Sequence, residues 1–134
     1  MTGDFPGAVP EIPVGSVGRA VAYYTSSLGF ARDWGGDDGG IAGISRGNCR
    51  LFLTDAAFRA QRGNAGPVLI WLNLSSRNEV DELHRQWSTD GARIASAPAS
   101  KPWKLHEFTA SDLDGNLLRV FYDFSWEEGR GTEV

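Results

Sequence analysis

The chain has 134 residues, of which 41% are hydrophobic and 22% are charged, and this size and composition predict one globular domain. A formal net charge of −4 argues against a nucleic-acid partner, which would need a clustered basic surface. The single cysteine, Cys49, excludes an internal disulfide and a cysteine-rich zinc site. No signal-peptide pattern or apolar run of membrane-spanning length is present, so we expect a cytoplasmic protein without a membrane partner.

The first half of the chain predicts a strand, a helix and three further strands. Residues 8–14 are extended, and their prolines suit an edge strand or a strand exchanged between subunits. Apolar residues at helical spacing follow from Val17 to Leu28, with Ser16 as the N-cap and Gly29 as the end. Three short strands come next, at residues 30–34, 41–46 and 49–54.

After a connector at residues 55–66, the second half repeats this order. Residues 68–74 form a strand, and Ser76 to Glu79 has the spacing of a capping box. The helix that follows ends near Gly91, and Trp87 lies on its apolar face, where we expect it to pack in the core. The last strands are predicted at residues 92–96, 106–111 and 116–122.

The same order of predicted elements, a strand, a helix and three strands, therefore occurs in both halves of the chain. We expect an α+β fold of two βαβββ modules. The modules span about residues 8–60 and 67–123, and residues 124–134 form a flexible tail. Together the modules are expected to form a curved mixed sheet. Its concave groove, opposite the helices, is the natural place for a ligand.

Two stretches carry a resemblance to a known family. Residues 20–30 read A-V-A-Y-Y-T-S-S-L-G-F, and residues 112–118 read D-L-D-G-N-L-L. Both resemble segments of the glyoxalase, bleomycin resistance and dioxygenase superfamily, which has the vicinal-oxygen-chelate fold. The resemblance covers about residues 8–123. Fold membership alone says little about activity, because this fold hosts many functions.

Three shorter segments resemble the bleomycin resistance branch of this superfamily. Ala8-Val9-Pro10 is similar to its N-terminal arm, which the two subunits of a homodimer exchange. Phe30 to Trp34 followed by Asp37-Asp38 resembles its acidic stretch, and Lys101-Pro102-Trp103 with Glu107-Phe108 resembles a segment beside its ligand. The resemblance implies a homodimer with a ligand groove at the interface of the subunits.

The resemblance also implies where the enzymes of this superfamily hold a divalent metal ion. In this chain those positions carry Val9, Leu69 and Arg119, and two aliphatic side chains and a guanidinium cannot coordinate a metal. Arg119 could instead form an ion pair with Glu11. We therefore expect no metal, no cofactor and no catalytic residue. A rearranged site, in which His84 or His106 joins Glu11 or Glu107, stays open as an alternative.

Other catalytic patterns are not visible either. No metalloprotease, phosphate-binding or nucleophile-elbow motif occurs. With no serine–histidine or cysteine–histidine pairing apparent, covalent catalysis has no candidate in the sequence. Cys49 lies in a predicted strand and is interpreted as a small buried residue.

Tryptophan is abundant, with five residues in this short chain. Trp34, Trp71 and Trp103 lie on or beside predicted strands, where a core role and a ligand role are both open. In bleomycin resistance proteins the residue that matches Trp103 stacks on a flat part of the drug, opposite an aromatic ring of the other subunit. Here that opposing position carries Ile41, and Trp34 could compensate for it.

Polar residues could complete the groove. Asp33, Asp37 and Asp38 form an acidic strip that is either a solvated turn or attracts a cationic ligand, which it can do only over about 8 Å at physiological salt. Thr54 and Asn73 could donate hydrogen bonds, and Gly115 would let a ligand approach the backbone. The full set of candidate ligand-binding residues is Trp34, Asp33, Asp37, Asp38, Ile41, Phe52, Thr54, Trp71, Asn73, Trp103, Glu107, Phe108, Gly115 and Arg119.

The sequence thus predicts a binding protein that sequesters a bleomycin-type antibiotic, or a similar cationic or planar small molecule, without changing it. Two alternatives stay open. One is a metal-dependent lyase, transferase or dioxygenase with rearranged ligands. The other is a binding module for another small planar metabolite.

Overall fold

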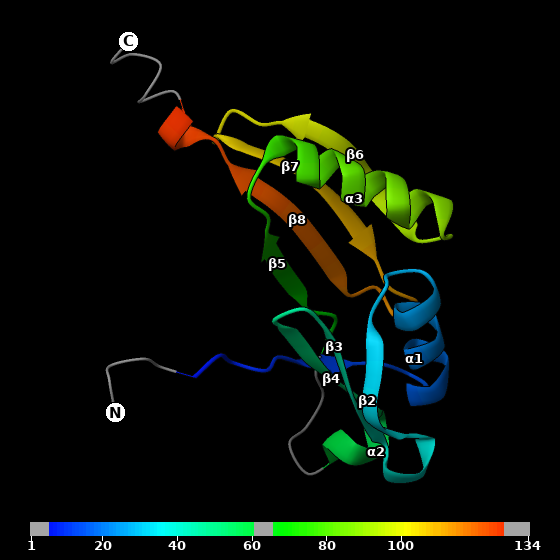
Figure 1. Cartoon of the computed structure of the whole chain (residues 1–134). Coiled ribbons are helices and arrows are strands. Elements are labelled where there is room, and N and C mark those ends of the chain that lie inside the picture. The colour runs from blue at the N-terminus through cyan, green and yellow to red at the C-terminus, as the bar shows by residue number, and fades with distance from the viewer. Residues whose placement is uncertain (1–5, 61–65, 128–134) are drawn as a thin grey trace. The chain divides into compact units, whose positions relative to one another are not determined.

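The structure of the chain is a computed structural model, and it describes residues 6–60 and 66–127. The chain divides into two compact units, and the boundary between them falls after Gly66. Each unit has its own sheet (Figure 1). In the part of the chain described, no helix is long and apolar enough to cross a membrane.

The first unit contains a four-stranded sheet in the order β1-β4-β3-β2. The strands β2, β3 and β4 are antiparallel neighbours, whereas β1 runs parallel to β4. The helix α1 lies between β1 and β2 in the chain, and a 3-10 turn, η1, and a short helix, α2, follow later. The bounds are β1 (Glu11–Pro13), α1 (Val17–Ser26), β2 (Ala31–Gly36), η1 (Asp37–Gly39), β3 (Ile41–Arg46), β4 (Cys49–Thr54) and α2 (Ala56–Arg59).

Local sequence sets the limits of α1. The hydroxyl oxygen of Ser16 accepts a hydrogen bond from the Arg19 N–H at 3.2 Å, which satisfies one of the free donors at the helix start. Gly29 has a φ of 76° shortly after the helix ends, a conformation that favours glycine. The predicted cap and the predicted end are therefore confirmed. The apolar face of α1 is buried, including Val17 and Tyr24.

The second unit repeats this plan, with the sheet order β5-β8-β7-β6. Again the first strand runs parallel to the last, and the other neighbours are antiparallel. The elements are β5 (Leu69–Asn73), α3 (Arg77–Thr89), β6 (Arg93–Ser100), β7 (Leu105–Ser111) and β8 (Leu117–Asp123). The α+β class and the duplicated βαβββ pattern are confirmed, with one four-stranded mixed sheet in each unit.

The helix α3 covers one face of the second sheet (Figure 1). Ser76 caps its start by accepting from the Glu79 N–H at 3.1 Å, and the Glu79 carboxylate accepts from the Ser75 N–H at 2.7 Å. The predicted core role of Trp87 is confirmed, because its ring packs edge-to-face on Phe108 at 5.6 Å and is 2% exposed. Phe108 therefore faces α3.

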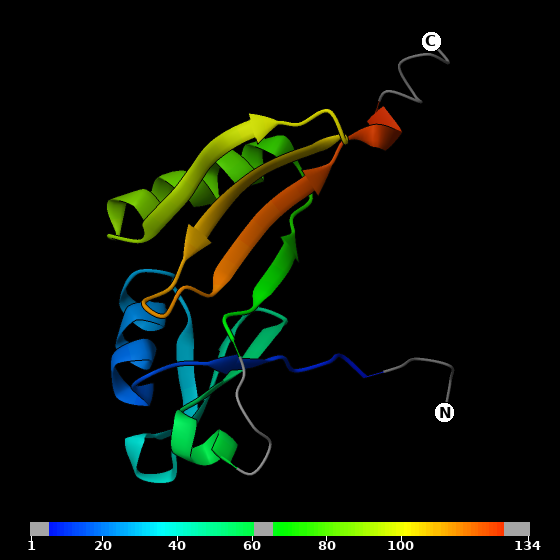
Figure 2. The ribbon, with the colours of Figure 1, turned by 180° about the vertical axis from the view of Figure 1, so that it is seen from behind.

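Alternation along the strands assigns the other face of the second sheet. Because Phe108 points toward α3, its neighbour Glu107 points away from the helix. The register pairs Glu107 with Phe121, and it pairs Trp71 with Arg119, two residues earlier on β8. We call this side, defined by Trp71, Glu107, Arg119 and Phe121, the open face of the second sheet. Figure 2 shows the sheet of this unit from the opposite direction to Figure 1.

A buried polar turn joins β7 to β8. The Asp112 carboxylate accepts from the backbone N–H of Asp114 at 2.8 Å and from the Asn116 side-chain amide at 2.8 Å. Gly115 has a φ of 84°, so a glycine is needed for the turn itself. The amide oxygen of Asn116 in turn accepts from the Val68 N–H at 2.8 Å, which holds the chain just before β5. The predicted turn at residues 114–116 is confirmed.

Replacement of Asn116 by alanine tests this turn. The variant leaves the 1% exposed Asp112 carboxylate and the Val68 N–H without this partner, so we expect the free energy of unfolding to fall by about 2 kcal/mol. Urea denaturation measures the change. Asn78→Ala, at an exposed position of α3, is the control and should change stability by about 0.5 kcal/mol or less. Equal stabilities of the two variants would contradict the role of the turn.

Candidate functional site

A buried carboxylate lies at the centre of the open face of the second sheet. Glu107 on β7 is 2% exposed. One of its oxygens accepts hydrogen bonds from Arg119 on β8, at 2.8 Å from Nε and from Nη2 as well. The other accepts from the Trp103 indole N–H at 3.0 Å. Both carboxylate oxygens are therefore satisfied, and a cation balances the negative charge.

Two tryptophans flank this ion pair. The guanidinium carbon of Arg119 lies 4.6 Å from the centre of the Trp71 ring and 6.0 Å from that of Trp103. Phe121 supports Trp71 with an edge-to-face contact at 5.4 Å. Even so, Trp71 is 47% exposed and Trp103 is 55% exposed. We call Trp71, Trp103, Arg119 and Glu107 the tryptophan platform, because two large ring surfaces are held in place yet stay open to solvent.

The loop between β6 and β7 positions Trp103. The Lys104 N–H donates to the Lys101 oxygen at 3.0 Å, which closes a turn around Trp103. Lys104 has a φ of 73°, a left-handed conformation that is uncommon for a residue with a side chain. The Lys101 ammonium lies 5.8 Å from the centre of the Trp103 ring. The loop thus brings this indole within reach of Glu107.

The first unit has a smaller aromatic cluster of its own. Trp34 on β2 and Phe52 on β4 meet edge-to-face at 5.1 Å. The indole of Trp34 covers Gly43 of β3, since a Cβ atom at Gly43 would lie 2.4 Å from the indole nitrogen. Trp34 is 40% exposed. This face of the first sheet therefore also presents an aromatic ring to solvent.

Polar contacts extend along the same face of the first sheet. Thr54, which the register places opposite Ile41, is buried and donates its hydroxyl to the Glu11 carboxylate at 3.2 Å. Arg59 of α2 donates to the Thr54 hydroxyl at 3.2 Å. Ile41, Phe52 and Thr54 are thus neighbours around the central strands of the unit. The role of Thr54 as a ligand donor stays a prediction.

The members of the predicted acidic strip make different contacts. The Asp33 carboxylate accepts from the Ser45 hydroxyl at 3.1 Å. The Asp37 carboxylate instead accepts from the Gly18 N–H at 2.8 Å, at the start of α1, where a negative charge stabilises the helix. Asp37 therefore has a capping contact, and its assignment to a ligand groove stays a prediction. Asp38 lies beside it in η1 and is exposed.

Other predicted site residues have structural roles. Phe108 is 0% exposed beneath α3, so its assignment as a ligand contact is wrong. The Asn73 amide donates to the backbone oxygens of Leu74 and Phe121 at 3.1 and 3.4 Å. Gly115 serves the turn described above. Within the second unit Arg119 pairs with Glu107, and its predicted pairing with Glu11 of the first unit stays a prediction.

The positions that the sequence resemblance assigned to metal ligands do not fit a divalent ion. Leu69 on β5 offers an exposed aliphatic side chain, and the guanidinium of Arg119 donates to Glu107. Within residues 6–60 and 66–127, no three His, Cys, Asp or Glu side chains gather in a way that could hold a metal. Burial raises the pKa of the Cys49 thiol, which disfavours the thiolate that metal binding requires.

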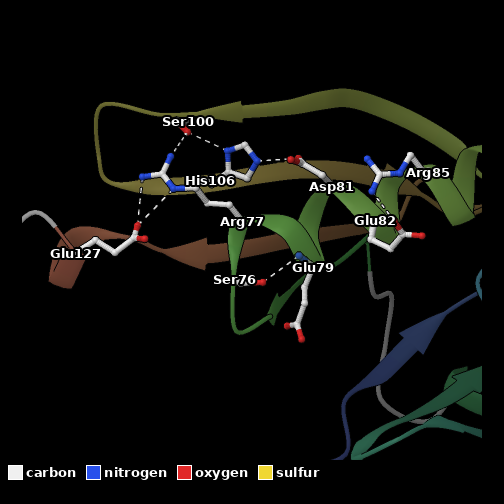
Figure 3. Close-up of polar contacts among 9 residues, drawn as sticks. All are labelled: Ser76, Arg77, Glu79, Asp81, Glu82, Arg85, Ser100, His106 and Glu127. Atoms are coloured by element: carbon white, nitrogen blue, oxygen red, sulfur yellow. Dashed lines mark hydrogen bonds and ion pairs between the residues drawn. The ribbon is translucent and has the colours of Figure 1, made fainter.

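A serine–histidine contact went unseen in the sequence. The hydroxyl of Ser100 lies 2.9 Å from Nδ1 of His106, whose Nε2 lies 2.8 Å from the Asp81 carboxylate (Figure 3). Ser100 ends β6 and His106 lies near the start of β7, so the two residues are only six positions apart in the chain. This short separation was the one feature of the sequence that could have indicated the contact. The contact itself depends on the register of β6 and β7, which places these two residues opposite each other.

The comparisons with known proteins agree with the fold and the duplicated plan. The model of the Glyoxalase/Bleomycin resistance protein/Dioxygenase superfamily matches residues 8–120, and the chain belongs to this superfamily. No curated protein sequence matches the chain.

Solved structures similar to this chain include proteins of different function. A bleomycin-binding protein from Streptomyces verticillus, solved with copper(II)-bleomycin, is 25% identical with a TM-score of 0.65, over 87% of this chain and 95% of that one. A lactoylglutathione lyase from Agrobacterium tumefaciens is 19% identical with a TM-score of 0.68, over 90% of this chain and 97% of that one. A superfamily protein from Nocardioides is 20% identical with a TM-score of 0.68, over 90% and 86% of the chains.

Replacement of Arg119 by methionine tests the ion pair of the tryptophan platform. Glu107 would keep a buried charge without its cation, so we expect the free energy of unfolding to fall by about 2–3 kcal/mol. The matched control is the double variant Arg119→Met with Glu107→Leu, which removes both charges and should regain most of that loss. Urea denaturation at neutral pH measures both. A double variant no more stable than the single one would contradict the pairing.

Proposed function

We propose that the chain binds a planar small molecule on the tryptophan platform and releases it chemically unchanged. The favoured ligand is a bleomycin-type antibiotic or a similar cationic or planar natural product, which the protein would keep away from its target. The observation that carries this proposal is the pair of exposed indoles, Trp71 and Trp103, whose ring centres lie 4.6 and 6.0 Å from the Arg119 guanidinium carbon.

The geometry of the platform suits a flat, unsaturated ring system. An indole that is about half exposed can bury its free face against a ligand, and each stacked ring pair adds about 0.5–1.5 kcal/mol beyond the burial of area. The indole N–H of Trp103 is held by Glu107, and Trp71 is held by Phe121 and Arg119. Since these rings are fixed before binding, little side-chain entropy is lost when a ligand stacks on them.

The charges of the platform favour binding over chemistry. Glu107 and Arg119 neutralise each other through two hydrogen bonds, so neither is poised as a free base or acid. A neutral platform also tolerates a cationic ligand, and the net charge of −4 on the chain does not repel one. The similarity to the Streptomyces verticillus protein supports the same class of ligand, since that protein is named for binding bleomycin.

Titration calorimetry with copper(II)-bleomycin tests the proposal. We expect a Kd of about 1 μM or tighter, as useful trapping of an antibiotic requires. Trp71→Ala should weaken the affinity about tenfold, because one stacking surface is lost. Trp126→Ala removes a tryptophan that is 50% exposed near the end of the second unit and is the matched control, with an unchanged affinity.

Two results would count against this function. Binding that is equal in wild type, Trp71→Ala and Trp103→Ala would remove the platform from the site. Stoichiometric manganese, iron, nickel or zinc in the purified protein, found by elemental analysis, would favour a metal-dependent enzyme instead.

We also propose that the chain forms a homodimer by exchange of its N-terminal arm. Residues 6–10 lie outside the helices and strands, and Gly7 and Ala8 are exposed. The Pro10 oxygen accepts from the Phe52 N–H at 3.0 Å, which fixes the arm to β4 at its base. Sedimentation velocity should give twice the chain mass of 14.5 kDa, and a variant without residues 2–9 should be a monomer. A monomeric wild-type protein would contradict the exchange.

A further inference from the structure

A hydrogen-bonded chain of three side chains lies on the α3 side of the second unit. The antiparallel register pairs Ser100 at the end of β6 with His106 near the start of β7, so both side chains point to the same side of the sheet. Asp81 reaches His106 from α3 (Figure 3). The distances are 2.9 Å from the Ser100 hydroxyl to Nδ1 of His106 and 2.8 Å from Nε2 to the Asp81 carboxylate.

A fourth residue contacts the serine. Arg77, one turn before Asp81 on α3, donates from Nη1 to the Ser100 oxygen at 3.0 Å. The proposed site uses the tautomer in which the serine donates its O–H to Nδ1 and Nε2–H donates to the Asp81 carboxylate. In this tautomer Nδ1 faces the serine as the acceptor, and the carboxylate orients the ring through Nε2.

The guanidinium of Arg77 is itself fixed in place. Glu127 accepts from its Nε and Nη2 at 3.4 and 3.3 Å, and its carbon lies 4.1 Å from the centre of the Phe124 ring. A fixed cation 3.0 Å from the Ser100 oxygen stabilises negative charge that develops there. Ser100 is exposed, so a substrate in solution can reach it.

We propose that Ser100, His106 and Asp81 form a nucleophilic site for small activated acyl esters, with Asp81 as a positioning residue. This site is separate from the tryptophan platform, which uses the other face of the same sheet. The arrangement satisfies the geometric requirement for an activated serine, namely a base in hydrogen-bond contact with the nucleophile and a third group that orients the base.

The reaction has two balanced steps. The Ser100 oxygen attacks the ester carbonyl carbon and its proton passes to Nδ1 of His106. The C–O bond to the leaving group then breaks, and the leaving group takes that proton and departs as an alcohol. Water next attacks the acyl-serine and gives a proton to His106. The bond to Ser100 breaks, the serine recovers the proton, and the carboxylic acid is released.

The same helix offers a matched comparison. Ser88 lies 3.4 Å from Nε2 of His84, at the i+4 spacing on α3. In the described part of the chain, no carboxylate contacts His84, whose ring packs against Phe108 at 5.3 Å instead. Ser88 therefore has a neighbouring imidazole without an orienting group and without an arginine, and we expect it to be unreactive.

A fluorophosphonate probe tests the proposal, because an activated serine displaces its fluoride and keeps the phosphonyl group. Intact-mass and peptide mass spectrometry should show one phosphonyl group per chain, on Ser100. Ser100→Ala should abolish labelling, and Ser88→Ala should label as wild type does. Asp81→Asn should slow labelling about 10²-fold, since the orienting carboxylate is lost.

A second readout separates an activated serine from a merely structural contact. With His106 as the base, the labelling rate of wild type should rise as the pH is raised, and His106→Gln should lose this dependence. No labelling of wild type, or equal labelling of wild type and Ser100→Ala, would overturn the proposal. Binding of copper(II)-bleomycin by Ser100→Ala is independent of these outcomes, so the platform and this site are tested separately.

Discussion

The open face of the second sheet depends on the burial of one carboxylate. An unpaired charge at the position of Glu107 would cost several kcal/mol, so the fold must supply a cation and a second donor. Arg119 supplies the cation from the neighbouring strand, and Trp103 supplies the indole N–H from a loop. Because Arg119 also lies against Trp71, one ion pair fixes the positions of both exposed rings.

Helix caps and tight turns could be predicted from the sequence, because they depend on residues close together in the chain. A short helix within a connector and a strand with an irregular register could not. The capping box of α3 and the turn before β8 follow from residues close together in the chain, and the structure has both. The helix α2 was missed inside a predicted connector, although Asp55 caps it by accepting from the Phe58 N–H. The strand β6 extends to Ser100, beyond its predicted end, because two irregularities in its register interrupt the alternation on which the prediction relied.

For the candidate site, the sequence could indicate which residues matter but not which of them contact one another. Trp71, Trp103, Glu107 and Arg119 could each be selected by residue type, but their mutual contacts depend on the register of β5, β7 and β8. Phe108 was wrongly selected with its neighbour because consecutive residues of a strand face opposite sides. The contact between Ser100 and His106 likewise requires the hairpin register, which residue types alone do not fix.

The absence of a Cβ atom at Gly43 makes room for the Trp34 ring on the first sheet. The indole of Trp34 rests where a Cβ would otherwise be, 2.4 Å from the ring nitrogen and 2.6 Å from the adjacent ring carbon. The indole thus packs directly against the backbone of β3 at Gly43. The absence of a side chain at Gly43 therefore sets the orientation in which Trp34 presents its ring to solvent. Any larger residue at this position would have to displace the indole.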